Sequence, residues 1–416
     1  MSEPNIFDKV PSPARQAIIV DAKYLDTRFV PDELPHRKEQ INDLVGLITP
    51  VLKGQPIQPI TVYGPPGSGK TAAITYIGRE FKRKVASTGK TISWTSINCY
   101  ENTSEYAIIR RLCSELEQLN KSAVIPPATG YSMPRLYLAL EKNLENFKTS
   151  VLVLDEIDQI FSRQMDGNSM LYRLSGLPVH LISITNDPSF KEFLDPRVKS
   201  RINFANSRIF QSYDAKELAD ILSKRAEHAF RPDSVDQNAI RYCAALAAQK
   251  GGDARMAIDL LRFAAQEADR EEANEISEKL VKSAVDSLVA SAAAQAIDQL
   301  DLTQAILFLA VMNTSPYLNY GAARTGDVFE VYANICLQNN LPHLTKRSIN
   351  TQLNALDKYH LISMRIRSFG RGGGRTSLIT PTIAHEAAIE GLENKIHEFP
   401  ELRNVISRTT GRSDRF

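Results

Sequence analysis

The sequence predicts three consecutive parts: an α/β domain with a parallel sheet and flanking helices, an α-helical domain, and a small domain in which helices precede a two-stranded hairpin. Three observations predict this order. Short apolar strands alternate with helices up to residue 211, helical periodicity alone follows from 212 to 298, and an amphipathic helix with two strands after it lies within 299–416. A chain of 416 residues is long enough for two or three domains. We therefore expect domains at 1–211, 212–298 and 299–416.

The composition is that of a globular protein, with 43% hydrophobic and 24% charged residues. The first residues lack a basic region followed by an apolar core, and no uninterrupted run of about 18 apolar residues occurs, so we expect neither a secretory signal nor a membrane span. The four cysteines have no short paired spacing, which argues against a zinc site and a disulfide framework. These features favour a cytoplasmic protein with no membrane partner.

A phosphate-binding loop follows the first strand. The apolar segment 60–63 runs into Gly64-Pro-Pro-Gly-Ser-Gly-Lys-Thr71, which matches G-x-x-x-x-G-K-[ST], and the apolar residues after it recur at helical spacing. Glycines let backbone N–H groups approach phosphates, and the helix N-terminus adds a favourable dipole. Lys70 would contact the β and γ phosphates, and the Thr71 hydroxyl would bind Mg²⁺. The predicted loop contacts are Gly64, Pro66, Gly67, Ser68, Gly69, Lys70 and Thr71.

A second strand ends in carboxylates. Residues 150–154 are almost entirely apolar, as in buried parallel strands, and Asp155-Glu156-Ile-Asp158 follows and resembles a Walker B motif. Asp155 would hold Mg²⁺ through its water shell, and Glu156 would orient and deprotonate the attacking water. The alternative is that both acids only cap the next helix, but the phosphate loop upstream favours nucleotide binding. The expected cofactors are ATP or ADP with Mg²⁺.

The next polar residues resemble the sensors and the arginine finger of AAA+ proteins. Asn186 follows the third buried strand at the sensor 1 position, with a turn residue as the alternative. Arg201, with Arg197 in reserve, resembles the finger that acts on a neighbouring subunit's nucleotide, and a solvated arginine is the alternative. Arg255 resembles sensor 2, in the first turn of a helix that Asp253 caps. A cation is poorly placed there unless an anion offsets it, which favours contact with a bound phosphate, and a surface arginine is the alternative.

Together these motifs resemble the archaeal origin-recognition and cell-division-control family of replication initiators, which are AAA+ proteins with a C-terminal winged helix. The resemblance extends to Phe29-Val-Pro-Asp-Glu-Leu-Pro-His-Arg37. It implies an adenine side lined by Pro35, His36 and Arg37, and a lid that closes the site with Tyr213 and Arg225. It also implies a DNA-contacting insertion, which we place within 121–135. From its residues alone that segment is a proline-interrupted loop between helices.

The last third carries a pattern suited to a polyanion. Seven basic residues and one acidic residue lie between 345 and 375, although the whole chain has a net charge of only +2. The predicted helix 345–358 is apolar on one side, and residues 361–368 and 377–380 are predicted strands around a basic, glycine-rich tip. Arg and Asn suit base edges, and arginines in such a tip suit the minor groove. The predicted DNA contacts are Lys346, Arg347, Asn350, Thr351, Asn354, Lys358, Arg371, Gly372, Gly373 and Arg375.

We therefore expect an ATP hydrolase that recognises duplex origin DNA, acts at the nucleoid and uses slow hydrolysis as a switch. Other initiator subunits and the replicative helicase are expected partners. Two alternatives remain open. A clamp-loader or branch-migration motor would show rapid, DNA-stimulated turnover, whereas a signalling ATPase would use its winged helix to bind proteins. For the helix 345–358 itself, the alternative is an amphipathic element whose charges are solvated.

Overall fold

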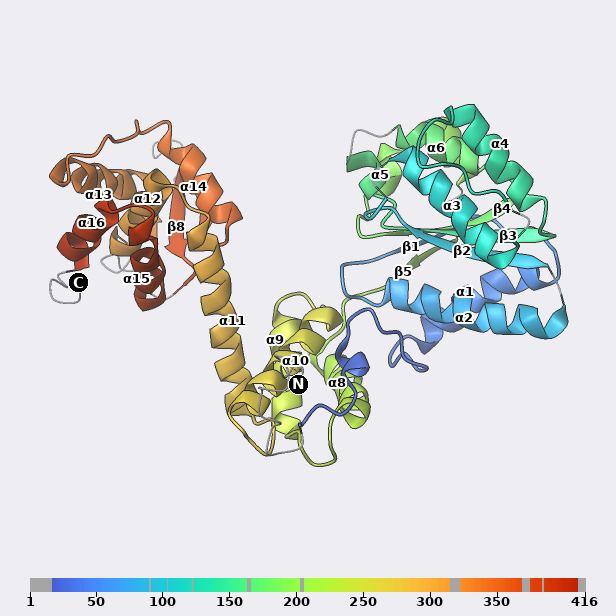
Figure 1. Ribbon diagram of the computed structural model, residues 1–416, viewed down its shortest axis with the longest axis horizontal. Helices are drawn as coiled ribbons and strands as arrows, with labels where there is room; N and C mark the ends of the chain where they lie inside the picture. Colours follow the sequence, from blue (N-terminus) through green and yellow to red (C-terminus); the bar gives the residue numbers. More distant parts are fainter. Residues whose placement is uncertain are drawn as a thin grey trace, which may run out of the picture. The chain divides into compact units, whose positions relative to one another are not determined.

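The computed structural model describes residues 17–89, 91–102, 104–121, 123–162, 166–202, 206–314, 322–368, 375–383 and 385–410. They form two compact units, which divide between Val281 and Lys282. The first unit contains a parallel sheet and a helical lid, and the second contains a group of helices with a small antiparallel sheet (Figure 1).

The first unit is built on a five-stranded parallel sheet in the order β2-β3-β4-β1-β5. Its strands are β1 (Ile60–Tyr63), β2 (Ile92–Asn98), β3 (Thr149–Asp155), β4 (Val179–Thr185) and β5 (Ser207–Ile209). Nearly all residues of β3 are buried, as expected of a strand that is covered on both faces. Because the strands are parallel, their carboxyl ends meet at one edge, where ligands of such sheets bind.

Helices cover both faces of this sheet (Figure 1). One layer consists of α1 (Lys38–Leu52) and α2 (Lys70–Thr88), and the other contains α3 (Glu105–Leu119), α4 (Met133–Leu144), α6 (Gly167–Leu174) and α7 (Pro196–Arg201). Successive residues of β3 alternate between the layers, with Val151 and Val153 in the α1–α2 core and Leu152 and Leu154 in the other. The short elements α5 (Gln159–Ser162) and η3 (Phe190–Phe193) follow β3 and β4. The predicted α/β domain with flanking helices is confirmed.

A helical lid follows the sheet and consists of α8 (Ala215–Ala229), α9 (Gln237–Gln249) and α10 (Ala254–Arg270). Asp253 caps α10, as the sequence predicted. The first described residues, including η2 (Ala22–Leu25), also pack here: the Val20 N–H donates to the Ala229 carbonyl (2.8 Å), and the Ile18 N–H donates to Asp269 Oδ1 (2.8 Å). This N-terminal segment therefore precedes the sheet in sequence but packs on the lid.

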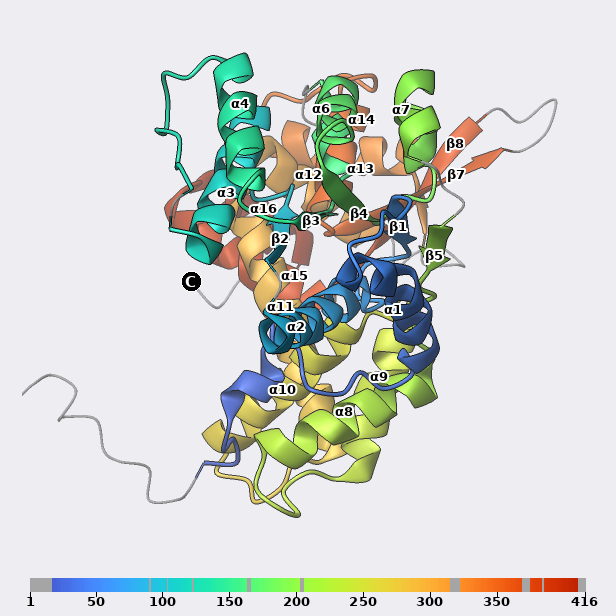
Figure 2. The same cartoon turned by 90° about the vertical axis from the view of Figure 1, so that its right-hand side faces the viewer.

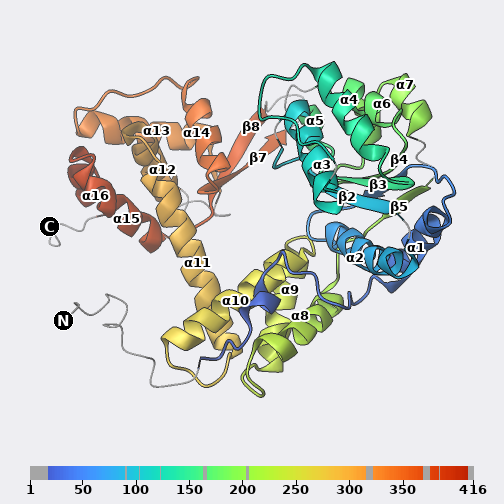
Figure 3. The same cartoon turned by 45° about the vertical axis from the view of Figure 1, so that its right-hand side comes forward.

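The second unit surrounds one apolar helix, α12 (Leu302–Thr314), whose residues from Ala305 to Met312 are all buried. The helix α11 (Glu278–Asp298) begins in the first unit and continues into the second. The other helices of the second unit (Figure 3) are α13 (Thr325–Gln338), α14 (Ile349–Lys358), α15 (His385–Asn394), η6 (Lys395–His397) and α16 (Glu401–Thr410). Lys395 is buried, and its Nζ donates to the Asp298 carbonyl at the end of α11 (2.6 Å). A cation is favourable at that end of a helix, so this bond joins α11 to the C-terminal helices.

A three-stranded antiparallel sheet, in the order β6-β8-β7, completes the second unit. Its strands are β6 (Ala323–Arg324), β7 (Ile362–Ser368) and β8 (Arg375–Pro381), and Figure 2 shows β7 and β8 as a two-stranded ribbon. The predicted order of helix then hairpin is confirmed, although α14 begins at Ile349 rather than at 345. The two-residue strand β6 was not predicted.

Candidate nucleotide-binding site

The phosphate loop between β1 and α2 has a backbone that requires glycine at two positions. Gly67 and Gly69 have φ angles of +68° and +88°, in the left-handed region. A Cβ atom on Gly67 would lie 1.7 Å from Asp253 Oδ1, and one on Gly69 would lie 2.6 Å from the Tyr213 hydroxyl oxygen. Asp253 and Tyr213 precede lid helices, so the lid side of the unit lies directly against the loop.

Lys70 is buried at the start of α2 and bonds to neutral oxygens. Its Nζ donates to the carbonyls of Gly64 (2.7 Å) and Pro65 (2.8 Å) and to Oδ1 of Asn186 (2.9 Å). Burial lowers the pKa of Lys70 to about 8, and the nearby Asp155 carboxylate opposes this shift. A nucleotide's phosphates would stabilise the charged ammonium that burial disfavours.

Two carboxylates stand at the end of β3. Asp155 is buried and accepts hydrogen bonds from the Thr71 hydroxyl (2.9 Å) and from the Glu156 N–H (2.9 Å). Burial raises the pKa of Asp155, while the bond from Thr71 opposes the rise. Burial and the Asp155 charge raise the pKa of Glu156, which suits a group that takes up a proton. Glu156 also has a φ of +53°, an unusual backbone conformation that occurs often at functional sites.

Asp158 joins the ends of two strands and is a site residue to which the sequence assigned no role. Its Oδ1 accepts hydrogen bonds from the Thr185 hydroxyl (2.7 Å) and from the Asn186 N–H (3.3 Å). Asn186 in turn accepts the bond from Lys70. Asp158 therefore helps to hold Asn186 in place. The available signal was a third acid only three positions after Asp155.

A cavity of about 760 Å³ opens at these groups, a size within the usual range for small-molecule ligands. Many of the residues predicted for the nucleotide line it: Pro35, Gly67, Gly69, Lys70, Thr71, Asp155, Glu156, Asn186, Tyr213, Arg225 and Arg255. The lining also includes residues that the sequence did not indicate, among them Arg28, Asn98, Glu101, Lys224 and His228. These come from the N-terminal segment, the region at the end of β2 and α8, which only tertiary packing brings together.

Some predicted residues lie beside the cavity instead of lining it. Gly64, Pro66 and Ser68 belong to the loop, and His36 and Arg37 contact the lid and the back of the loop. Arg225 lines the cavity, but its guanidinium nitrogens donate to the carbonyls of Tyr24 and Phe29, both at 2.9 Å. Arg225 therefore holds the N-terminal segment in place.

The two candidate finger arginines are exposed and lie outside this cavity. The Arg201 guanidinium stacks on the Tyr172 ring, with 3.9 Å from its central carbon to the ring centroid, whereas Arg197 is 5.9 Å from the same ring. Nη1 of Arg201 also donates to the Tyr172 carbonyl (3.3 Å). Tyr172 therefore holds Arg201 more closely than it holds Arg197.

In the second unit, α14 separates apolar from polar residues. Its buried side consists of Ile349, Leu353 and Leu356, as the sequence predicted. The polar residues predicted to contact DNA are all exposed: Lys346, Arg347, Asn350, Thr351, Asn354 and Lys358. Asp357, the acid within this helix, accepts a hydrogen bond from the Met364 N–H of β7 (3.0 Å). Arg371, Gly372 and Gly373 lie outside the described residues, and only the backbone of Arg375, in β8, is described.

Three family profiles match consecutive parts of the chain. The profile described as "AAA ATPase domain" matches residues 33–184, "Cdc6 AAA+ ATPase-type lid domain" matches 219–286, and "CDC6, C terminal winged helix domain" matches 295–390. Similarity to curated proteins extends across all three parts.

The "ORC1-type DNA replication protein" of Pyrococcus furiosus is 35% identical over 353 residues, which cover 83% of each chain. The chain belongs to the ORC1-type DNA replication proteins. "ORC1-type DNA replication protein 1" of Sulfurisphaera tokodaii is 33% identical, over 94% of this chain and 97% of its own length.

Solved structures agree with this ORC1-type assignment. The structure described as the Aeropyrum pernix ORC1 protein in complex with DNA matches with a TM-score of 0.72 and 30% identity, over 94% of this chain and 100% of that chain. Cdc6p from Pyrobaculum aerophilum matches at 20% identity with a TM-score of 0.52, which supports the fold alone. The predicted AAA+ ATPase with a helical lid and a winged helix is therefore confirmed, and the chain is a nucleotide-binding ATP hydrolase and a replication initiator of this type. Within the described residues of this ORC1-type protein, no helix is long and apolar enough to cross a bilayer.

Proposed function

We propose that this chain binds ATP with Mg²⁺ and recognises duplex DNA at replication origins. The observation that carries the proposal is the convergence of Lys70, Asn186, Asp155 and Thr71 on one cavity, which Arg255 of the lid also lines. The exposed polar side of α14 is the second support, and the DNA complex of the A. pernix ORC1 protein is the third. Family membership favours an initiator over the motor and signalling alternatives.

The cavity residues suit magnesium nucleotide chemistry. The Thr71 hydroxyl and the Asp155 carboxylate, 2.9 Å apart, are the oxygen donors that Mg²⁺ prefers, and Mg²⁺ would neutralise charge on the β and γ phosphates. Lys70 and the loop N–H groups bind the phosphates. Glu156 orients the attacking water and takes a proton from it, and Asn186 stands at the sensor 1 position, where its Oδ1 accepts a hydrogen bond from Lys70. Arg255 adds positive charge from the lid, beside Asp155 and Glu156.

Hydrolysis acts as a slow switch. The lid contacts the loop through Asp253 and Tyr213, so a nucleotide in the cavity changes the angle between base and lid. That angle decides whether α14 and the segment 121–135 engage DNA together, with a coupling of about 1 to 3 kcal/mol. Arg201, with Arg197 in reserve, reaches the nucleotide of a neighbouring initiator subunit, since both lie outside the chain's own cavity. The assembled protein acts at the nucleoid in the cytoplasm and recruits the replicative helicase.

The test measures binding of labelled origin duplex by fluorescence anisotropy with MgATP, with MgADP and without nucleotide. We expect affinities that differ by about 5- to 150-fold between nucleotide states, which corresponds to the coupling above. The Lys70→Ala variant should lose the difference. Identical affinities in all three states for the unmodified chain would refute the switch.

A salt titration distinguishes DNA binding from protein binding by the winged helix. Arg347→Ala and the double change of Arg371 and Arg375 to Ala should each weaken binding. Each phosphate contact that is lost should lower the slope of log affinity against log salt by about one. Arg403→Ala, at an exposed position on α16, serves as the control and should leave the slope unchanged. A salt-independent affinity would favour a protein-binding winged helix.

A further inference from the structure

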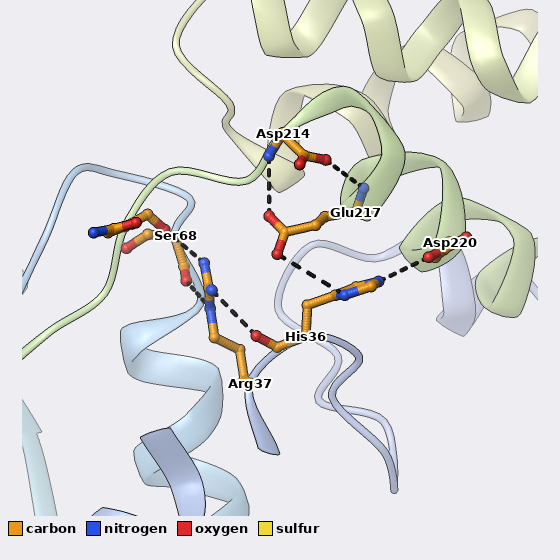
Figure 4. A network of polar contacts seen from close by, with 7 residues as sticks. His36, Arg37, Ser68, Asp214, Glu217 and Asp220 are labelled. Atoms are coloured by element: carbon orange, nitrogen blue, oxygen red, sulfur yellow. Dashed lines mark hydrogen bonds and ion pairs between the residues drawn. The ribbon is translucent and has the colours of Figure 1, made fainter. Parts of the chain in front are cut away.

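Arg37 lies between the phosphate loop and the beginning of the lid, and it contacts both. Its Nε donates to the Ser68 carbonyl of the loop (2.9 Å), and its Nη2 donates to the Gln211 carbonyl between β5 and α8 (2.6 Å). Its guanidinium also stacks on Tyr213, with 3.8 Å from its central carbon to the ring centroid. Two segments far apart in the sequence, the phosphate loop at Ser68 and the segment 211–213 before α8, thus meet at this one side chain. Part of this arrangement is drawn in Figure 4.

The buried charge of Arg37 favours one arrangement of the phosphate loop and the segment before the lid. The residue is only 3% exposed, and within the described part of the chain its guanidinium forms no ion pair with a carboxylate. Burial of an unpaired charge is costly unless its N–H groups are satisfied, and here carbonyl oxygens and an aromatic face satisfy them. The guanidinium therefore favours the conformation in which Ser68, Gln211 and Tyr213 are all in contact with it.

The bond to Ser68 acts on the phosphate-binding backbone. The carbonyl of Ser68 and the N–H of Gly69 belong to the same peptide group, so a charged donor on the carbonyl polarises the N–H. Gly69 lies in the loop at a φ of +88°, and the Tyr213 hydroxyl packs against it. Arg37 thereby orients one peptide of the loop while it holds the lid segment that covers the same peptide.

His36, the preceding residue, extends the connection to α8 (Figure 4). Its backbone is left-handed, with a φ of +59°, and its Nε2 lies 2.9 Å from Asp220 Oδ2. Its Nδ1 lies 3.9 Å from Oε1 of Glu217, which belongs to the capping box at the start of α8. Because His36 contacts the lid helix and Arg37 contacts the loop, two adjacent residues link the two parts.

We propose that Arg37 is a positioning residue that couples the phosphate loop to the lid, so that occupation of the loop is transmitted to α8 through Arg37 and His36. The inference rests on the proposed nucleotide switch. It assigns the communication between loop and lid in that switch to the contacts of Arg37 and His36. Arg37 does not touch the nucleotide in this assignment; it acts through the Ser68–Gly69 peptide and Tyr213. Loss of Arg37 should therefore leave a chain that still binds ATP but whose lid moves less in response.

The experiment measures the base-to-lid distance by double electron–electron resonance in the full-length chain. Spin labels are placed at Lys84→Cys on α2 and Ala245→Cys on α9, both exposed positions, and the four native cysteines are buried. Distances are recorded with MgATP, with MgADP and without nucleotide, in Arg37→Lys, Arg37→Gln and Tyr213→Leu backgrounds. The matched control is Arg79→Lys. Arg79 is likewise an arginine that bonds to backbone carbonyls of another segment, those of Val30 (3.2 Å) and Pro31 (3.1 Å), but the bonds recorded for it in the described part of the chain involve neither the loop nor α8.

We expect a distance change on MgATP binding in the unmodified chain and in Arg79→Lys, and less than about half of that change in the Arg37 variants. ATP affinity should weaken by less than about tenfold in Arg37→Lys, because the Lys retains the charge but not the fork of donors. Tyr213→Leu, which removes the stacking ring from the lid side, should reduce the change as well. Thermal unfolding is measured with and without MgATP for each variant. A cooperative transition shows that the variant is folded, and a higher Tm with MgATP shows that it binds the nucleotide.

The outcomes separate this inference from the proposed function. If folded Arg37 variants bind MgATP and show the full distance change, Arg37 is merely structural and the inference is wrong, while the switch stands. If the unmodified chain binds MgATP without any change of the base-to-lid distance, both the Arg37 coupling and the nucleotide switch are wrong. If Arg37→Gln does not fold, the test depends on Arg37→Lys and Tyr213→Leu. A full change of the base-to-lid distance on MgATP binding in both variants then overturns the proposed role of Arg37.

Discussion

The buried ammonium of Lys70 predicts an unusual pH dependence of nucleotide binding. Burial lowers the pKa of Lys70 to about 8, whereas in an unfolded chain it titrates near 10.5. Only the charged form attracts phosphates strongly, and bound phosphates raise the pKa again. Affinity for ATP should therefore be constant below about pH 7 and fall as the pH rises through 8, until the pKa of the complex is reached.

The magnitude follows from the protonated fraction. With a pKa of about 8, roughly 90% of Lys70 is charged at about pH 7 and roughly 10% at about pH 9. ATP affinity should therefore weaken by about tenfold, or about 1.4 kcal/mol, between these two values. The same shift predicts that the nucleotide-free protein gains stability between about pH 8 and 10.5, because the unfolded state binds more protons there.

Isothermal titration calorimetry with MgATP, in buffers from about pH 7 to 9, measures the effect and the accompanying proton uptake. The control is Lys70→Arg, whose guanidinium stays charged throughout this range. Lys70→Arg should bind MgATP more weakly than the unmodified chain at every pH, but its affinity should hardly change with pH. A flat profile for the unmodified chain, or the same tenfold fall in Lys70→Arg, would refute the assignment of the pH dependence to Lys70.

Three further predictions concern the catalytic carboxylate, the loop and the winged helix. Glu156→Gln should keep ATP affinity but lower kcat at least ~100-fold in a phosphate-release assay; activity within tenfold of normal would exclude Glu156 as the base. Gly67→Ala should weaken ATP binding by about tenfold or more, because its Cβ would lie 1.7 Å from Asp253 Oδ1 at a φ of +68°. Unchanged affinity would mean that the loop and lid separate readily. Leu353→Ala should destabilise the second unit by about 2–5 kcal/mol in thermal unfolding, whereas exposed Asn354→Ala should change stability by less than about 0.5 kcal/mol yet weaken DNA binding; the reverse pattern would contradict the assigned faces.

Elements with a simple local pattern could be predicted from the sequence. The continuous apolar residues of β3 and the helical spacing of Ile349, Leu353 and Leu356 indicated their structures because burial follows the period of each element. Strand β2 was missed for the opposite reason. Its Ser93 and Thr95 are buried, and they are tolerated there because Ser93 bonds to the Ser150 hydroxyl (2.7 Å) and Thr95 to the Val151 carbonyl (3.4 Å), both on the neighbouring strand. No feature of residues 92–98 alone shows that such a partner exists.

For the candidate site, too, residues within motifs could be predicted from the sequence and residues outside motifs could not. Lys70, Thr71 and Asp155 stand in motifs whose chemistry is recognisable by residue type and spacing. The lining residues Arg28 and Glu101 carry no such signal, since each lies in a segment without a motif.

The sequence by itself determined the phosphate loop, the carboxylates after β3, and the helix and hairpin of the second unit. Each of these is formed by residues within a few positions of one another, so the backbone geometry that they require is local. Only the tertiary structure decided that Arg37 contacts Gln211, 174 positions away, and that Asp253 packs against Gly67. Contacts of this kind depend on how the lid packs against the sheet, and that packing results from many weak apolar contacts acting together.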